Sequence, residues 1–403
     1  MATPRTIVIV GASLAGLRAA ETLRREGYRD RVVLVGAESH LPYDRPPLSK
    51  ELLAGEWEPE QVALRKQPYD DLELDLRLGR RATGLDVSGR AIEVDGGETL
   101  PFDGLVIATG AHPRTLPDTP ALEGIFVLRT IDDCLAIRAR LETRPRIVVI
   151  GAGFIGSEVA ATCRGRGLDV TVLEMLPTPL VRAVGPIVGD ACGRLQREHG
   201  VDLRCGVTVA GFEGRERVER VRLADGRTID ADVVVVGVGV APETAWLDGS
   251  GVAVDDGVVC DATCLAAPGI VAAGDVARWP NLLFDGESMR VEHWTNATEQ
   301  GVAAARRLLA DDASDAEAFA PVPFVWSDQY DVKIQVVGSI RGDDEVALAD
   351  GSLDEDRFVA LFGRAGRLVG ALGFSRPRIV MQYRRMIAER ASWDDALARA
   401  AGG

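Results

Sequence analysis

Two segments of the chain share one pattern of apolar and polar positions. Each begins with a run of β-branched residues, passes directly into a glycine-containing turn and continues as an alanine-rich segment that favours a helix. A strand that leads straight into such a turn and helix is typical of a dinucleotide-binding βαβ unit. The expected elements are a strand, turn and helix over 6–25 with a strand at 31–35, and the same series over 146–165 with a strand at 169–174.

The two turns differ at one position. The second copy has all three glycines of the phosphate-binding pattern, whereas the first has Ser13 at the middle position, which narrows the space near a pyrophosphate but still offers a backbone N–H. A tight turn that only packs helix on strand is the alternative for the first copy. The candidate residues are Gly11, Ser13, Leu14, Ala15 and Gly16 in the first turn, and Gly151, Gly153, Phe154, Ile155 and Gly156 in the second.

An acidic residue about 20 positions after such a turn is expected to hold the ribose hydroxyls. In the first copy this residue is Glu38, which follows Gly36 and Ala37, so the backbone of Ala37 is a second candidate. In the second copy Glu174 ends the strand, where a carboxylate repels a 2′-phosphate and favours NADH over NADPH. The nearby Arg182 is an opposing signal, because an arginine there can accommodate that phosphate.

The pattern after the second βαβ unit indicates that the chain returns to the first domain and then forms a third domain. Strands that end in close-approach glycines are expected at 105–110 and 269–275, with Ala108, Thr109, Gly110, Gly274 and Asp275 as FAD candidates, and a helix is expected over 295–309. We predict an α/β fold with two Rossmann-like dinucleotide-binding domains, for FAD and NAD, and a small α+β C-terminal domain with strands at 332–337, 357–362 and 368–374. The boundaries are 1–114 and 244–320 for the FAD domain, 115–243 for the NAD domain and 321–403 for the third, with 310–320 as a linker.

The charge and composition of the chain limit the kinds of partner and ligand that we expect. The net charge of −15 argues against nucleic acid, which rewards basic surfaces. The longest apolar run, 233–241, is far below the roughly 20 residues that span a bilayer, and the chain enters its first strand at once, so we expect a cytoplasmic protein without a membrane partner. The six cysteines lack metal-ligand spacing and are interpreted as buried thiols, so no metal is expected.

Three further motifs carry a resemblance to a known family. They are Pro-Tyr-Asp-Arg-Pro-Pro-Leu-Ser-Lys at 42–50, Glu-His-Trp-Thr-Asn-Ala at 292–297 and Trp-Ser-Asp-Gln-Tyr at 326–330. With these motifs, the chain resembles the glutathione-reductase-like flavoproteins along essentially its whole length. Within that superfamily it is similar to the FAD-dependent NADH:ferredoxin reductases of bacterial oxygenase systems, of the putidaredoxin reductase and rhodocoxin reductase type.

The resemblance implies a set of site residues. Lys50 is expected at the flavin ring, paired with Glu158, which would keep the lysine charged and oriented. The start of the 295–309 helix would aim N–H groups at the flavin. Trp326 would cover the flavin, with a simple core role as the alternative, and 237–242 would form a nicotinamide-side loop or only a glycine-rich crossing. The family positions expected at FAD are Arg45, Ala82, Arg129, Glu292, His293, Trp294, Ala297 and Trp326, and those expected at NAD are Glu158, Gly237 and Gly239.

The positions of the cysteines decide among reactions of this superfamily. A disulfide reductase needs a cysteine pair in the early part of the first domain, and a peroxidase needs one near 40–50, but the first cysteine here is Cys134. A flavin without a thiol relay passes electrons to an external acceptor, receiving two as hydride and releasing them singly. The resemblance implies a [2Fe-2S] ferredoxin that supplies a haem or Rieske-type oxygenase. An NADH-sensing flavoprotein of the apoptosis-inducing-factor type and a rubredoxin reductase are the alternatives.

An acidic reductase needs a local basic patch to attract an acidic ferredoxin. The candidates, by family analogy and charge, are Arg65, Lys66, Arg306 and Arg307. Solvated charges at helix ends are the alternative for each of them.

Overall fold

The computed structural model describes residues 4–310 and 315–402, which form two compact units. The first contains the described residues of 1–44, 63–112 and 241–323. The second contains those of 45–62, 113–240 and 324–403.

A six-stranded sheet forms the centre of the first unit, in the order β19-β20-β7-β1-β2-β3. Its strands pair in parallel except β19, which is antiparallel to β20. The apolar runs in β1 and β2 are almost fully buried, as expected for a parallel sheet covered on both faces. The strands are β1 (Thr6–Val10), β2 (Arg31–Gly36), β3 (Leu74–Leu78), β7 (Gly104–Ile107), β19 (Leu265–Ala267) and β20 (Ile270–Ala272).

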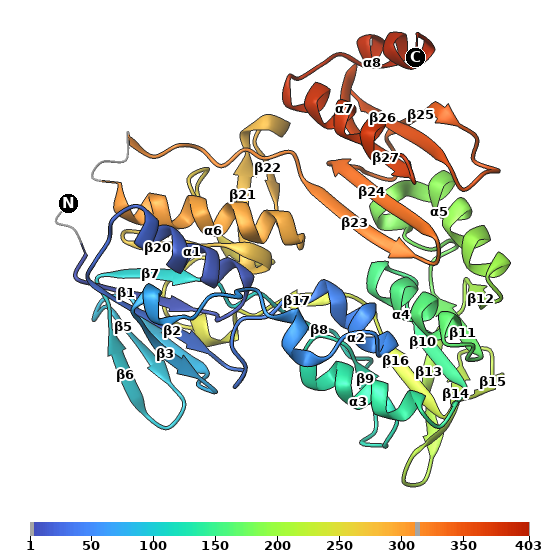
Figure 1. The fold of residues 1–403 in the computed structure, drawn as a ribbon, viewed down its shortest axis with the longest axis horizontal. Coiled ribbons are helices and arrows are strands. Elements are labelled where there is room, and N and C mark those ends of the chain that lie inside the picture. The colour runs from blue at the N-terminus through green and yellow to red at the C-terminus, as the bar shows by residue number, and fades with distance from the viewer. Residues whose placement is uncertain (1–3, 311–314, 403) are drawn as a thin grey trace. The chain divides into compact units, whose positions relative to one another are not determined.

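Two helices pack together against this sheet, α1 (Leu14–Arg25) and α6 (Trp294–Leu309) (Figure 1). Their contact is made by small residues: a Cβ added at Gly301 would lie 2.5 Å from the carbonyl oxygen of Ala15. The sequence therefore brings the amino ends of α1 and α6 near one edge of the sheet.

Smaller elements complete the first unit. Short 3-10 turns lie at η3 (Asp70–Leu72), η4 (Ala245–Leu247), η5 (Gly274–Val276) and η6 (Leu282–Phe284). Two three-stranded sheets are formed by β4 (Ala82–Asp86), β5 (Ala91–Val94) and β6 (Glu98–Pro101), and by β18 (Val258–Val259), β21 (Ala277–Asn281) and β22 (Glu287–Met289). The strands β8 (Ala111–Pro113) and β17 (Val240–Pro242), which pair with each other, each contain a point where the chain passes from one unit to the other.

The second unit contains a parallel sheet of the same kind, in the order β12-β11-β10-β16-β9. Its strands are β9 (Ile125–Val127), β10 (Ile147–Ile150), β11 (Val170–Glu174), β12 (Asp202–Cys205) and β16 (Val233–Val236). The accompanying elements are η1 (Pro46–Ser49), α2 (Glu51–Ala54), η2 (Pro59–Val62), α3 (Ile131–Leu141), α4 (Phe154–Gly165), α5 (Val181–Glu198) and the antiparallel strands β13 (Val209–Gly214), β14 (Val218–Leu223) and β15 (Thr228–Asp230).

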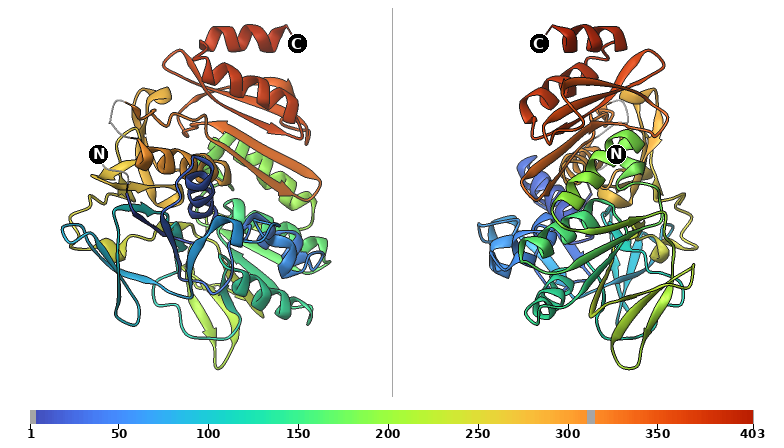
Figure 2. Two further views of the ribbon diagram at one scale, coloured as in Figure 1. Left: turned by 60° about the vertical axis from the view of Figure 1, so that its left-hand side comes forward. Right: turned by 90° about the vertical axis from the view of Figure 1, so that its right-hand side faces the viewer.

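The same unit includes an antiparallel C-terminal sheet in the order β23-β24-β27-β26-β25. Two helices pack on it (Figure 2). Its core includes the stacked rings of Phe358 and Phe374, whose centroids are 4.5 Å apart. The elements are β23 (Phe324–Gln329), β24 (Val332–Gly338), β25 (Glu345–Gly351), β26 (Phe358–Arg364), β27 (Arg367–Phe374), α7 (Pro377–Ala388) and α8 (Trp393–Ala401).

The predicted fold class is confirmed: two Rossmann-like parallel sheets and an α+β C-terminal part are present. The domain boundaries stay a prediction. The linker expected at 310–320 falls partly on residues 311–314, which lie outside the described residues. Its later part is anchored, because Phe319 packs against Trp279 and accepts a hydrogen bond from the indole N–H.

The close approach of each turn to its helix gives a stability prediction. A Cβ at Gly156 would lie 2.0 Å from the Gly151 carbonyl oxygen, so the Gly156→Ala variant must displace backbone. We expect it to lower the free energy of unfolding by about 1–3 kcal/mol. Gly165→Ala, at the other end of α4, is the control, because its Cβ meets open space among the described residues. Urea unfolding measures both, and equal midpoints for Gly156→Ala and the wild type would contradict the packing.

Candidate functional site

The first glycine turn joins β1 to α1 with almost no space between backbone segments. Gly11 has φ +120°, and a Cβ there would lie 2.0 Å from the Ala108 carbonyl oxygen. A Cβ at Gly16 would lie 1.9 Å from the Gly11 carbonyl oxygen. Ser13 is the N-cap of α1 and, within the described part of the chain, its hydroxyl does not cap the helix. The N–H groups of the first helical turn therefore suit an anionic group such as a pyrophosphate.

The second turn repeats this arrangement between β10 and α4. Gly151 has φ +100°, and its Cβ would lie 2.3 Å from the Gly237 carbonyl oxygen. A Cβ at Gly153 would meet open space as far as residues 4–310 and 315–402 are concerned. Phe154 and Ile155 begin α4 directly after this open position, and Ile155 is exposed. Ser13 and Gly153 thus occupy equivalent N-cap positions, and both have extended backbone.

The acidic residues expected at the riboses lie beside the two turns. The Glu174 carboxylate accepts hydrogen bonds from the N–H groups of Ala152 at 2.7 Å and Leu176 at 2.8 Å. It is therefore held at the second turn, and each oxygen still has a lone pair to accept from a ribose hydroxyl. In the first unit, Glu38 accepts a 2.5 Å hydrogen bond from the Tyr43 hydroxyl.

The strand-end glycines lie next to the first turn. Gly274 has φ +78°, and its Cβ would lie 3.0 Å from the Ala15 Cβ and 3.7 Å from the Ala297 Cβ. Its N–H donates to Gln300 on α6 at 2.9 Å. On the other side, the Thr109 hydroxyl donates to the carbonyl oxygen of Glu243 at 2.7 Å. The other expected positions of this unit, Ala37, Ala82, Ala108, Gly110 and Asp275, lie at the ends or starts of β2, β4, β7 and β20 or just beyond them.

The amino end of α6 contains buried polar atoms that need a partner. His293 Nδ1, Asn296 Oδ1 and Thr298 Oγ1 have no hydrogen-bond partner among the described residues. Burial lowers the pKa of His293 to about 4, and the opposing charge of Asp275 compensates only partly, so the ring is neutral at pH 7. Buried polar groups are normally satisfied, so these atoms fit a bound group with donors and acceptors, as a flavin ring is. Together with the glycine turns, they fit FAD.

The residues beside His293 are fixed by strong contacts. Trp294 donates its indole N–H to Asp44 at 2.7 Å, which ties α6 to the end of the 42–44 segment. Glu292 forms a 2.6 Å ion pair with Arg290.

A buried ion pair lies in the second unit. Lys50 Nζ is 2.7 Å from Glu158 Oε2, and their side chains are 13% and 4% exposed. Glu158 lies on α4 two residues after Gly156, and Lys50 follows η1. The segment before Lys50 is held to the same unit, because Arg45 donates to the Arg129 carbonyl oxygen at 2.5 Å. The structure therefore brings together the two residues that the resemblance had paired.

Two serines that the sequence interpretation did not assign complete this ion pair. Ser49 donates to Glu158 Oε2 at 2.5 Å, and Ser327 donates to Oε1 at 2.6 Å. Ser327 belongs to the 326–330 motif, which could have indicated a site residue. Of that motif, only Trp326 is assigned a role from the sequence. Trp326 lies on β23, with its ring 6.0 Å from that of Phe324.

All six cysteines are free, and five of them are buried. Burial raises the pKa of every one, to about 12 for Cys134, Cys163, Cys192 and Cys260. These thiols are protonated at pH 7 and are poor nucleophiles. Among residues 4–310 and 315–402, no group of His, Cys, Asp and Glu side chains is arranged to hold a metal ion.

Three of the four basic residues expected at a docking face make polar contacts. Of the candidate basic residues, Arg65 pairs with Asp71 and Glu21, and Arg306 pairs with Glu26, while Arg307 donates to the Thr263 hydroxyl.

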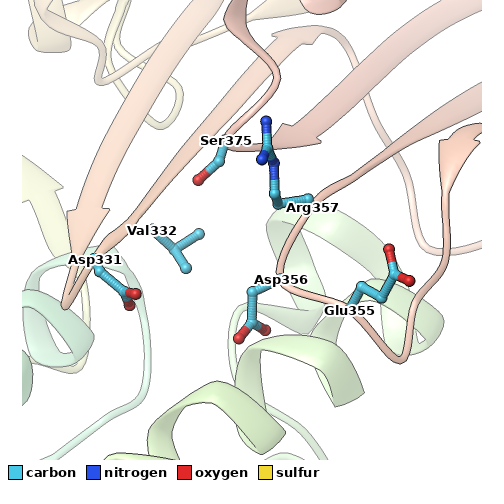
Figure 3. Close-up of a pocket in the computed structure, with 6 residues that line it drawn as sticks. All are labelled: Asp331, Val332, Glu355, Asp356, Arg357 and Ser375. Atoms are coloured by element: carbon cyan, nitrogen blue, oxygen red, sulfur yellow. The ribbon is translucent and has the colours of Figure 1, made fainter.

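A pocket of about 530 Å³ lies at the C-terminal sheet and is lined by residues other than the cofactor candidates (Figure 3). Its lining residues are Asp331, Val332, Glu355, Asp356, Arg357 and Ser375. In the described chain, we find no helix with the length and apolar character of a membrane span.

Comparison with known proteins agrees with this site. Residues 5–301 match the pyridine nucleotide-disulphide oxidoreductase family, and residues 324–401 match the reductase C-terminal domain. The ferredoxin reductase component of chlorobenzene dioxygenase from Cupriavidus sp. (strain PS12) is 36% identical, over 97% of this chain and 94% of its own. The ferredoxin–NAD(+) reductase component of the biphenyl dioxygenase system of Paraburkholderia xenovorans (strain LB400) is 35% identical, over 96% and 94%.

A solved structure is similar over almost the whole chain. The covalent complex of putidaredoxin reductase with putidaredoxin contains a chain with a TM-score of 0.90 and 33% identity, covering 96% of this chain and 93% of that one. The chain therefore belongs to the pyridine nucleotide-disulphide oxidoreductase family, and it also carries a reductase C-terminal domain.

Proposed function

We propose that this protein is an FAD-dependent NADH:ferredoxin reductase that supplies electrons to an oxygenase through a [2Fe-2S] ferredoxin. The observation that carries the proposal is the combination of two dinucleotide turns with a buried Lys50–Glu158 pair and no cysteine before Cys134. The relatives named as ferredoxin reductase components of dioxygenases, and the reductase solved with putidaredoxin, support the choice of acceptor.

FAD would be held mainly by the first unit. The N–H groups at the start of α1 would bind the pyrophosphate, and Glu38 and Asp275 would accept from its sugar and ribityl hydroxyls. His293 and the first turn of α6 would meet the flavin ring with neutral donors and acceptors. When bound, FAD accepts a hydride from NADH and releases single electrons to a one-electron carrier.

NADH would bind at the second turn. The N–H groups that begin α4 would bind its pyrophosphate, and Glu174 would accept from the adenosine ribose hydroxyls and reject a 2′-phosphate. Gly237 and Gly239 would leave backbone space on the nicotinamide side. Lys50 would place a positive charge at the flavin, where charge accumulates on reduction, and Glu158 would fix the direction of its ammonium group. No side chain needs to act as a general acid or base.

We also propose a cytoplasmic location and the division into an FAD domain (1–114 and 244–320), an NAD domain (115–243) and a C-terminal domain (321–403). The docking face would include Arg65, Lys66, Arg306 and Arg307. Three of these make local polar contacts. Because salt screens charges at the surface, their attraction for an acidic ferredoxin would be weakest at high salt.

The proposal is tested by steady-state kinetics with the FAD-loaded protein. We expect NADH oxidation to depend on added [2Fe-2S] ferredoxin and to continue for many turnovers. Reduction of the protein by NADH without turnover on ferredoxin or cytochrome c would favour a sensor of the apoptosis-inducing-factor type. Turnover with rubredoxin but not with ferredoxin would identify the other alternative.

The lysine gives the first functional prediction. Lys50→Ala removes the positive charge and leaves Glu158 buried without its counter-ion. We expect flavin reduction by NADH to slow by about tenfold, which corresponds to roughly 1.4 kcal/mol, with weaker retention of FAD. Stopped-flow absorbance measures the rate. Lys66→Ala, which changes an exposed lysine, is the matched control. An unchanged rate and FAD content in Lys50→Ala would remove Lys50 from the site.

The preference for NADH over NADPH gives the second functional prediction. Glu174→Ala removes the carboxylate at the ribose position, so kcat/KM for NADH should fall by about tenfold while that for NADPH changes little, a difference of roughly 1.4 kcal/mol. The exposed Glu219→Ala variant, on β14 of the same unit, should behave like the wild type. A wild-type enzyme that is faster with NADPH would overturn the assignment.

A further inference from the structure

The C-terminal sheet contributes a hydroxyl group to the buried Lys50–Glu158 pair. We propose that Ser327 is a positioning residue that holds the Glu158 carboxylate, and through it directs the Lys50 ammonium group. This inference rests on the proposed function, because Lys50 matters for electron transfer only if a flavin lies beside it.

The two oxygens of Glu158 have different partners. Oε2 accepts from Lys50 and Ser49, whereas Oε1 accepts from Ser327. Since Glu158 is only 3% exposed, water cannot replace a lost donor without opening the packing. A buried carboxylate oxygen that loses its donor keeps its full cost of desolvation. Removal of the Ser327 hydroxyl is therefore expected to turn the carboxylate and to alter its contact with Lys50.

A neighbouring amide orients the Ser327 hydroxyl. Gln329 Nε2 donates to Ser327 Oγ at 3.2 Å, so the single hydroxyl hydrogen of Ser327 is left for Glu158. Both side chains are fully buried. The result is a chain of donors that runs in one direction, from Gln329 to Ser327 and then to Glu158.

The alternation of side chains along β23 explains why these residues act together. Ser327 and Gln329 are two positions apart and share one face of the strand, which packs against α4. Trp326 and Asp328 lie on the other face, where Asp328 forms a half-exposed ion pair with Lys333. The 326–330 motif therefore has two faces, and the one that faces α4 supplies the contact to Glu158.

The contact also joins parts of the chain that are far apart in sequence. Lys50 comes from the segment at 45–62, Glu158 from the second βαβ unit and Ser327 from the C-terminal sheet. The first strand of the C-terminal sheet thus completes the set of donors around the carboxylate. This gives that sheet a direct role at the ion pair, separate from any role of Trp326.

The test is a set of substitutions measured on the FAD-loaded protein. In Ser327→Ala, we expect the equilibrium constant for flavin reduction by NADH to fall about tenfold and the rate of reduction to fall about five- to tenfold. Ser327→Thr, which keeps a hydroxyl, should restore most of both. Ser339→Ala, in the loop after β24, is the control and should leave both unchanged. If Ser327→Ala does not accumulate as folded protein, Ser327→Cys makes the same measurement, because a thiol keeps the volume but is a weak donor.

A double variant separates positioning from a merely structural role. If Ser327 acts through Glu158 and Lys50, the shift in the flavin equilibrium caused by Ser327→Ala should be absent when Lys50 is already alanine. An equal shift in both backgrounds, or a lower unfolding midpoint with an unchanged equilibrium, would overturn the inference. A wild-type protein that fails to bind FAD or to oxidise NADH would instead overturn the proposed function.

Discussion

The architecture depends on the absence of side chains at four positions. At Gly11, Gly16, Gly151 and Gly156, a Cβ would lie 1.9 to 2.3 Å from a backbone carbonyl oxygen. Only glycine lets the strand, the turn and the following helix come this close. Because the helix starts directly at the strand end, its unpaired N–H groups face the edge of the sheet. Both dinucleotide sites follow from this one constraint, and the acidic residues at 38 and 174 take their places relative to it.

A second constraint is the burial of Glu158. A carboxylate with so little exposure is stable only when charged and hydrogen-bonding partners surround it. The chain provides one ammonium group and two hydroxyl groups from two distant segments, one with Ser49 and Lys50 and the other with Ser327. The cysteines differ from this carboxylate, because burial raises their pKa values and keeps the thiols protonated and uncharged.

Much of this followed from the sequence, for physical reasons that differ by element. The strands at β1 and β10 are continuous β-branched runs, so their burial in parallel sheets was predictable. The sheets β4-β5-β6 and β13-β14-β15 were missed, because their strands are short and half exposed, with a weak apolar signal. The kink of α5 at Gly185 and Pro186 was missed as well.

The site was predictable only in part. Local spacing indicated the glycine turns and Glu174, while the pairing of Lys50 with Glu158 came from a family resemblance. Ser49 and Ser327 were not assigned, because a serine carries little signal by itself and its role depends on contacts across more than 100 positions.

The central claim is that two-electron and one-electron chemistry meet at a bound flavin without help from any thiol. The most direct measurement is the number of ferredoxin molecules reduced per NADH under anaerobic conditions, before and after alkylation of Cys205, the cysteine that is not fully buried. The account predicts two per NADH, at the same rate in both samples. A loss of ferredoxin reduction on alkylation, with the fold intact, would show that a cysteine carries electrons and would contradict it.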